Sequence, residues 1–205
     1  MVLHPTYFPN ISHGVAMANS EAIVFEVFDN YQKQTYRNRC DIYGANGKLT
    51  LTVPVSYTQK NRQLYKDVRI HNEEKWQLHH LKSLQSAYRT SPFFEYYEDD
   101  LRPLFNTKFE FLLDFNFKCI DILLECLQLD LSYSLTDTFL KDIDPSVDMR
   151  GLVNPTTART LNFESYTQVF QEKHGYINNL SILDLIFNEG PNAPNYLQSQ
   201  TLHML

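Results

Sequence analysis

Residues 2–28 read VLHPTYFPNISHGVAMANSEAIVFEVF and contain two apolar runs separated by a loop and a helical segment. Val2 and Leu3 form the first run, and residues 22–28 form the second, which is rich enough in branched side chains for a buried strand. Between them lies a loop with two prolines, followed by residues 11–19, which favour a short helix. This order of strand, helix and strand predicts a parallel unit.

The next residues predict a hairpin. Residues 36–43 and 48–55 flank Asn46-Gly47, which is a strong turn signal. Apolar and polar side chains alternate through the second of these segments, as they do in a half-buried strand. Residues 64–70 favour one more short strand.

From residue 73 the apolar period changes from two to about 3.6, which is typical of helices. We expect three of them, at residues 73–89, at residues 91–105 with Ser91 as the N-cap, and at residues 108–129. The rest of the chain predicts a strand at 131–135, an exposed excursion at 137–155 and a helix at 179–187 that ends near Gly190-Pro191. The fold expected is one α/β domain over residues 1–205, with helices packed over a mixed sheet; a segregated α+β arrangement is the alternative.

Composition excludes several classes of protein. The chain has 205 residues, and its 43% hydrophobic and 14% aromatic content argues against disorder. It has neither an apolar run of membrane-spanning length nor a secretion signal, so we expect no membrane span and a cytoplasmic location. Cys40, Cys119 and Cys126 show no paired short spacing, so no disulfide framework and no metal site is expected.

Charge is unevenly distributed along the chain. Residues 31–89 carry 11 Lys or Arg and 4 Asp or Glu, a local balance of +7, whereas the whole chain has a net charge of −6. A net acidic protein binds nucleic acid poorly, so no nucleic-acid partner is expected. The basic region still suits a small anionic ligand such as a sugar nucleotide.

The loop at residues 4–14 is the first candidate site. It opens at the carboxyl edge of the predicted parallel strands, where α/β sheets bind ligands, and its prolines hold Tyr7 between them. The alternative is a turn that places Tyr7 in the core. His4 and His13 lie nine residues apart, unlike the closely spaced histidine pair of nucleotidylyltransferases.

The segment that opens the hairpin is the second candidate. If it is extended, Arg37 and Arg39 lie on one face, with Tyr36 and Asn38 on the other. Two guanidinium groups so placed could clamp a diphosphate. A charged edge strand that discourages pairing is the alternative.

The predicted helix at residues 73–89 has two faces. A basic stripe contains Lys75, His79, Lys82, Ser86 and Arg89, and an apolar half contains Trp76, His80, Leu84, Ala87 and Tyr88. His79 on the basic stripe could contact an anion. His80 on the apolar half is either a functional residue or a hydrogen-bonded core histidine. The acidic run at residues 95–100 is expected to be a solvated face.

Several blocks of the chain together resemble a known family. They are the Pro-x-Tyr-x-Pro of residues 5–9, YQKQTYRNRC at 31–40, Asn46-Gly47 with LTVPV at 51–55, KDVRI at 66–70, WQLHH at 76–80, Ala87-Tyr88 with SPFFEYY at 91–97, and NLSILDLIFNEGP at 179–191. This ordered series is similar to the WbqC-like protein family. The positions that match the family's motifs are Pro5, Tyr7, Pro9, Asn38, Arg39, Trp76, His80, Tyr88, Pro92 and Asn188, whereas His4 and His13 stand outside them.

The resemblance implies a role in bacterial surface polysaccharide (O-antigen) synthesis, by transfer of an amino acid such as glycine onto an amino sugar. We therefore expect a transferase that acts on a nucleotide-linked amino sugar. The expected catalytic residues are His80 as the general base, with Tyr7 and Asn38 as oxyanion donors. The expected substrate-binding residues are Arg37, Arg39, Tyr36, Trp76, Tyr88 and His4.

Two other functions are open at this point. One is a non-enzymatic protein that binds a glycan or a partner in the same pathway, because the standard hydrolase, kinase and dehydrogenase motifs are absent. The other is a nucleotidylyltransferase-like enzyme. The sequence leaves the cofactor unknown and the oligomeric state open.

Overall fold

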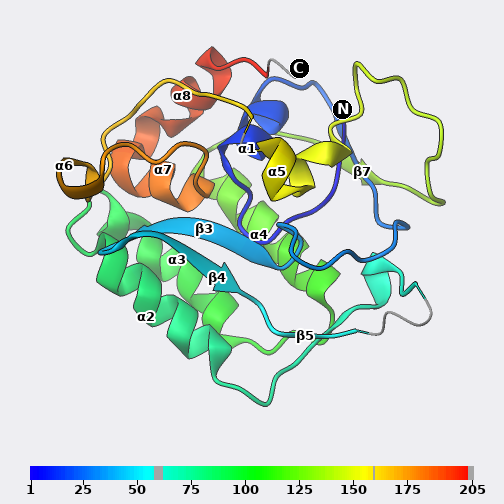
Figure 1. Ribbon diagram of the computed structural model, residues 1–205, viewed down its shortest axis with the longest axis horizontal. Helices are drawn as coiled ribbons and strands as arrows, with labels where there is room; N and C mark the ends of the chain where they lie inside the picture. Colours follow the sequence, from blue (N-terminus) through cyan, green and yellow to red (C-terminus); the bar gives the residue numbers. More distant parts are fainter. Residues whose placement is uncertain (58–61, 159, 203–205) are drawn as a thin grey trace.

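The opening residues form a parallel sheet in the computed structural model, which describes residues 1–57, 62–158 and 160–202 (Figure 1). β1 (Val2–Leu3) pairs in parallel with β2 (Ile23–Phe25), and β2 pairs in parallel with β7 (Tyr133–Leu135). Helix α1 (Ile11–Ala18) connects the first two strands and begins at Asn10, whose side chain accepts a hydrogen bond from the His13 amide. The predicted strand, helix and strand unit is confirmed, and so is the later strand.

A fourth segment extends this sheet beyond β1. The Val2 amide donates to the Val147 carbonyl at 2.8 Å, and the Met149 amide donates to the Val2 carbonyl at 2.9 Å, in a parallel bridge. These bonds satisfy the backbone groups on the outer edge of β1. The predicted excursion at 137–155 is therefore exposed only in its first part. Its second part forms a 3-10 turn (Arg150–Val153) and α5 (Pro155–Ala158).

The predicted hairpin is confirmed. β3 (Arg39–Gly44) and β4 (Gly47–Thr52) pair antiparallel, and Gly47 has the positive φ of 96° that the tight turn requires. β3 begins later than predicted because residues 33–38 form turns. A separate antiparallel pair consists of β5 (Val55–Ser56) and β6 (Arg69–Ile70), and a 3-10 turn (Tyr65–Asp67) replaces the first half of the strand predicted at 64–70.

The three middle helices are α2 (Trp76–Tyr88), α3 (Phe94–Asn106) and α4 (Leu112–Cys126). Figure 1 shows α2 and α3 side by side, and α3 also packs against α4. Ser91 does not cap α3, because residues 91–93 form a turn and the helix begins at Phe94. α4 begins later than predicted, because Glu110 and Phe111 pair with the backbone of β6 instead.

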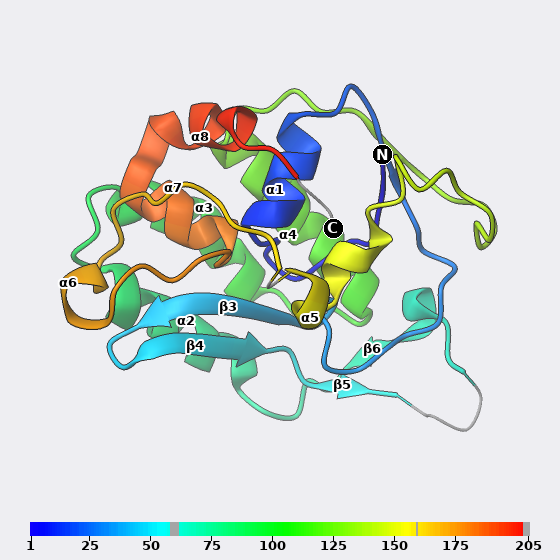
Figure 2. The same ribbon diagram turned by 45° about the horizontal axis from the view of Figure 1, so that its top comes forward.

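The final helices cover α1. α7 (Ile182–Glu189) and α8 (Ala193–Ser199) pack against it, and the short α6 (Gln171–His174) lies at the turn end of the hairpin (Figure 2). The sequence predicted α7 but neither α6 nor α8. The fold is α/β, with parallel and antiparallel pairs in three small sheets.

A large hydrophobic core, which contains residues from Leu3 to Leu197, joins most of these elements. Tyr36, Val153 and Ala158 form a second, small cluster. A single domain over residues 1–205 stays a prediction, which this shared core supports. No helix in the described ranges has the length and apolar character needed to cross a bilayer.

The end of α7 gives a first testable consequence. Gly190 has a φ of 51°, and a Cβ atom at this position would lie 2.5 Å from the Phe93 ring. We expect Gly190→Ala to lower the free energy of unfolding by about 2–4 kcal/mol, since backbone strain and overpacking add. Urea unfolding measures this loss.

Gly151→Ala is the matched control. A Cβ atom there would meet only Thr157 Cγ2, at 3.8 Å, and the backbone needs no positive φ. Its effect should stay within about 0.5 kcal/mol. Equal losses in the two variants would contradict the steric reason given for Gly190.

Candidate functional site

Four parallel segments end at the same edge of the sheet, and each delivers a polar residue there. His4 follows β1, Glu26 follows β2, Thr136 follows β7, and Arg150 follows the segment that pairs with β1. Thr136 Oγ1 donates to Glu26 Oε1 at 3.0 Å, and Arg150 Nη1 lies 3.7 Å from Glu26 Oε2. Because open α/β sheets bind ligands at their carboxyl edge, this cluster marks a candidate site.

A cleft of 480 Å³ opens beside the cluster. We call it the carboxyl-edge cleft. It is lined by His4, Asp29, Gln32, Arg37, Phe139, Asp148, Arg150, Gly151, Val153 and Asn154.

His4 is the histidine of the cleft, and its side chain is only 3% exposed. Its Nδ1 lies 3.2 Å from the Glu26 carbonyl oxygen, to which it must donate, so Nε2 of the neutral ring accepts from Arg37 Nη2 at 3.0 Å. Burial lowers the pKa of His4 below its usual value, although the hydrogen bond that the protonated ring would donate to Asp29 acts in the opposite direction. At neutral pH the cleft therefore contains a neutral imidazole whose Nε2 carries no proton.

Arg37 is held inside the protein. Its Nη2 donates to Asp29 Oδ2 at 2.8 Å, and its guanidinium lies 5.5 Å from the centroid of the Tyr65 ring. The side chain is 1% exposed, and Nε is buried without a hydrogen-bond partner among the described residues.

The prediction that Arg37 and Arg39 share one strand face is wrong. Arg37 lies in the turn before β3, where Asp29 and His4 draw its side chain inwards. Arg39 is the first residue of β3 and is partly exposed. The two guanidinium groups therefore form no clamp along a strand.

Arg150 forms the opposite wall of the cleft. It makes a bidentate pair with Asp148, from Nε to Oδ1 at 2.8 Å and from Nη2 to Oδ2 at 2.7 Å. Its guanidinium lies over the Phe139 ring, 5.5 Å from the centroid, and Phe139 itself is 49% exposed. Sequence reasoning missed Asp29, Phe139, Asp148 and Arg150. For Asp29, its place just after the predicted second strand was an available signal.

His80 and Tyr7 meet in the core. The Tyr7 hydroxyl lies 2.8 Å from His80 Nδ1, the backbone of Thr52 also hydrogen-bonds the imidazole, and Trp76 packs edge-on with ring centroids 5.2 Å apart. Burial lowers the pKa of His80 to about 4. Tyr7 is fully buried, as the alternative interpretation of its loop expected.

Asn38 lies beside the carboxyl end of β4, near the Thr52 backbone that His80 contacts. Its Nδ2 donates to the Val53 carbonyl at 2.9 Å. The structure thus brings His80, Tyr7 and Asn38 to one region, but none of them lines the carboxyl-edge cleft. Their catalytic roles stay predictions.

The other expected substrate-binding residues lie apart from the cleft. Tyr36 is buried with Val153 and lines a separate pocket of 130 Å³. Tyr88 is in the core, where its hydroxyl accepts from the Tyr43 amide and donates to Asp184. Of the nine residues expected at the site, only His4 and Arg37 line the cleft.

A comparison with known protein families places this chain in one of them. The model of the WbqC-like protein family matches residues 4–162. The chain belongs to the WbqC-like protein family. No curated protein and no solved structure matches it. The residues matched to the WbqC-like family include the whole lining of the cleft, whereas the block at 179–191 lies outside the match.

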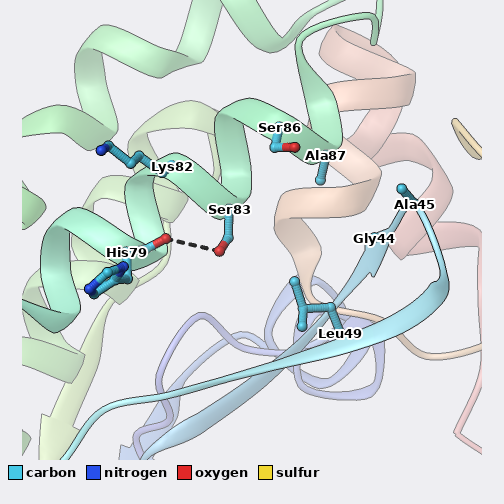
Figure 3. Close-up of a pocket in the computed structure, with 8 residues that line it drawn as sticks. All are labelled: Gly44, Ala45, Leu49, His79, Lys82, Ser83, Ser86 and Ala87. Carbon is cyan, nitrogen blue, oxygen red and sulfur yellow. Dashed lines mark hydrogen bonds between the residues drawn. The ribbon is translucent and has the colours of Figure 1, made fainter.

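The WbqC-like chain also has a groove between α2 and the hairpin turn (Figure 3). This groove of 290 Å³ is lined by Gly44, Ala45, Leu49, His79, Lys82, Ser83, Ser86 and Ala87. The predicted basic stripe is confirmed as exposed, and the predicted apolar half of α2 as buried. Figure 3 shows Lys82 extending away from the hairpin, and the Ser83 hydroxyl donates to the His79 carbonyl. The groove contains no buried charged side chain, so it is a weaker candidate than the cleft.

Two further predictions concern residues outside the cleft and the groove. Glu95, Asp99 and Asp100 are exposed on α3, as expected for a solvated acidic face, whereas Glu98 is partly buried and accepts hydrogen bonds from Gln85 and Arg102. Cys40 and Cys119 are buried free thiols. Within the described ranges, no group of three or more His, Cys, Asp or Glu side chains is arranged to hold a metal ion.

His80→Gln tests whether the WbqC-like chain uses His80 for packing or chemistry. We expect a loss of about 1–3 kcal/mol in the free energy of unfolding, because Tyr7 and the Thr52 backbone lose a buried partner. Chemical unfolding measures the loss. His79→Gln, at the exposed neighbouring position, should change it by no more than about 0.5 kcal/mol. Unchanged stability together with lost turnover would instead assign His80 to the chemistry.

Proposed function

We propose that this WbqC-like chain is a cytoplasmic transferase of bacterial surface polysaccharide synthesis. It adds an amino acid or another acyl group to the amine of a nucleotide-linked amino sugar bound in the carboxyl-edge cleft. The observation that carries this proposal is the neutral His4 imidazole, whose Nε2 lies between Arg37 and Asp29 in an open cleft. A general base needs an unprotonated nitrogen at the substrate. His4 Nε2 is unprotonated, and a bound ammonium would replace Arg37 Nη2 as its hydrogen-bond donor.

Different residues of the cleft serve substrate binding and proton transfer in this proposal. Arg37 and Arg150 supply guanidinium donors for a diphosphate. The exposed ring of Phe139 offers a surface on which a base or sugar can stack. His4 Nε2 accepts the proton of the sugar ammonium.

The reaction then forms one bond and breaks another. The neutral amine attacks the carbonyl carbon of an activated acyl donor, which is an acyl adenylate or a thioester. The new C–N bond forms as the bond to the AMP or thiolate leaving group breaks, and the second proton that the nitrogen loses passes to the departing group.

His80 and Tyr7 act as positioning residues in this scheme. They hold the loop that follows His4, because Tyr7 is anchored to His80 through its hydroxyl and to the Tyr36 carbonyl through its amide. Asn38 holds the end of β4 instead, through the Val53 carbonyl. A rigid loop fixes the orientation of the His4 ring.

The experiment supplies the purified protein with UDP-glucosamine and a preformed glycyl thioester, with glycine and ATP in a parallel reaction, and detects the glycylated sugar nucleotide by mass spectrometry. We expect product, and a loss of about 10²-fold in turnover for His4→Gln. His71→Gln, at an exposed histidine outside the cleft, should retain full turnover. The absence of both product and sugar-nucleotide binding would contradict the proposal.

A non-enzymatic binding protein of the same pathway is the second candidate. It is favoured by the burial of Tyr7, His80 and Asn38, the three side chains expected to be catalytic. This function would be identified if the protein bound the sugar nucleotide without turnover and if His4→Gln left the affinity unchanged.

A further inference from the structure

The charges that line the carboxyl-edge cleft balance. Arg37 and Arg150 contribute two positive charges, Asp29 and Asp148 contribute two negative charges, and His4 is neutral. A ligand that is only anionic gains no net attraction from this lining, because each guanidinium already faces a carboxylate. A ligand with charges of both signs matches the lining.

The two carboxylates differ in the hydrogen-bonding capacity that they leave unused. Asp148 accepts from the Arg150 amide and from Nε at Oδ1, and from Nη2 at Oδ2. Asp29 accepts from the Asn30 amide at Oδ1 and from Arg37 Nη2 at Oδ2. Since each carboxylate oxygen has about two acceptor sites, Asp29 keeps more of its capacity for a ligand.

Arg37 has unused donors beside the same carboxylate. Its Nη2 is engaged by Asp29 and His4, its Nη1 makes only a 3.5 Å bond to Thr35, and its buried Nε has no described partner. Although burial opposes it, the contacts with His4 and Arg37 hold the pKa of Asp29 below its usual value, so the carboxylate is ionised at neutral pH. A free acceptor and free donors thus lie within one charge cluster.

We infer that the cleft selects sugar nucleotides that carry a free primary ammonium, and that Asp29 is the residue that binds this ammonium. The inference rests on the proposed function and names the residue that recognises the substrate's ammonium. Asp29 Oδ2 lies 3.2 Å from His4 Nε2, so an ammonium held by Asp29 has the proton acceptor beside it. The ammonium replaces Arg37 Nη2 as the donor to His4 Nε2. An N–H bond of the ammonium then breaks, the proton moves to Nε2, and the lone pair stays on the amine. Asp29 then faces the imidazolium.

The test compares three ligands by isothermal titration calorimetry, at a pH where the sugar amine is protonated. UDP-glucosamine carries the ammonium, UDP-glucose replaces it with a hydroxyl group, and UDP-N-acetylglucosamine replaces it with a bulkier neutral amide. We expect UDP-glucosamine to bind at least about ten-fold more tightly than the other two, which corresponds to about 1.4 kcal/mol.

Asp29→Asn should reduce the ratio between UDP-glucosamine and UDP-glucose to about one. Asp99→Asn, at an exposed carboxylate on α3, should leave the ratio unchanged. The three-ligand comparison needs no variant, so it decides the matter even if Asp29→Asn does not fold.

The outcomes separate this inference from the proposed function. Equal binding of UDP-glucosamine and UDP-glucose, with weaker binding of the acetylated sugar, would indicate selection by size and overturn the inference. Equal binding of all three would also overturn it, while sugar-nucleotide binding itself would stand. Binding of none of them would count against the proposed function.

Discussion

Replacement of Arg37 by methionine is expected to lower the free energy of unfolding by about 3–5 kcal/mol. The variant leaves Asp29 as a partly buried carboxylate without its guanidinium partner, and it removes a hydrogen-bond donor from His4. Methionine fills most of the volume, so the loss reports the polar contacts rather than a cavity. Urea unfolding at neutral pH measures it.

Arg39→Met is the matched control, two residues away. The Arg39 side chain makes no hydrogen bond or ion pair with any residue that the structure describes, and it is partly exposed. Its replacement should change the free energy of unfolding by less than about 1 kcal/mol. Similar losses in the two variants would show that the contacts of Arg37 with Asp29 and His4 contribute little.

A loss of similar size is expected for Asp184→Leu. Asp184 is completely buried, and its carboxylate accepts hydrogen bonds from the Tyr88 and Tyr166 hydroxyls, at 2.8 and 2.6 Å, and from Gln168 Nε2 at 3.0 Å. Leucine leaves the buried Tyr88 and Tyr166 hydroxyls without an acceptor, at about 1–3 kcal/mol for each unsatisfied group, partly offset by removal of the buried charge. Gln168 Nε2 loses one acceptor and keeps the Ile177 carbonyl. We expect a net loss of about 3–5 kcal/mol at neutral pH.

The pH dependence of that loss gives an independent check. Burial raises the pKa of Asp184 from 3.8 to about 6, so the folded state binds this proton more tightly than the unfolded state does. The contribution of Asp184 to stability is therefore present at low pH and falls as the pH rises from about 4 to about 6, by about 3 kcal/mol. The difference in stability between wild type and Asp184→Leu should be larger at pH 4 than at pH 7. A difference that grows with pH would contradict this interpretation.

Local signals predicted the elements of the fold where local chemistry decides them. Asn46-Gly47 specified the hairpin turn, because Gly47 supplies the positive φ. The period of α2 correctly assigned its buried and exposed faces. Ser91 is a residue type that commonly caps helices, but residues 91–93 form a turn and α3 begins after them, at Phe94.

The candidate site was harder to predict because its contacts are long-range. The loop after β1 was expected at the carboxyl edge of the sheet, and His4 lies there. Arg150 could not be assigned, since it reaches the site only because residues 147–149 return to pair with β1. The position of the Arg37 side chain is set by its ion pair with Asp29, and the alternation of residues along a strand does not reveal that contact.

The position of β1 between β2 and residues 147–149 also determines when the cleft can assemble during synthesis. β1 leaves the ribosome before both segments that pair with it, and one of these two neighbours is made about 145 residues later. At roughly 5–20 residues per second, that interval is roughly 7–30 s. Until then His4 lacks the Arg150 wall, and the outer edge of β1 is open to other strands. A nascent chain stalled before residue 147 would therefore expose an unpaired strand edge, which is a known starting point for misassembly.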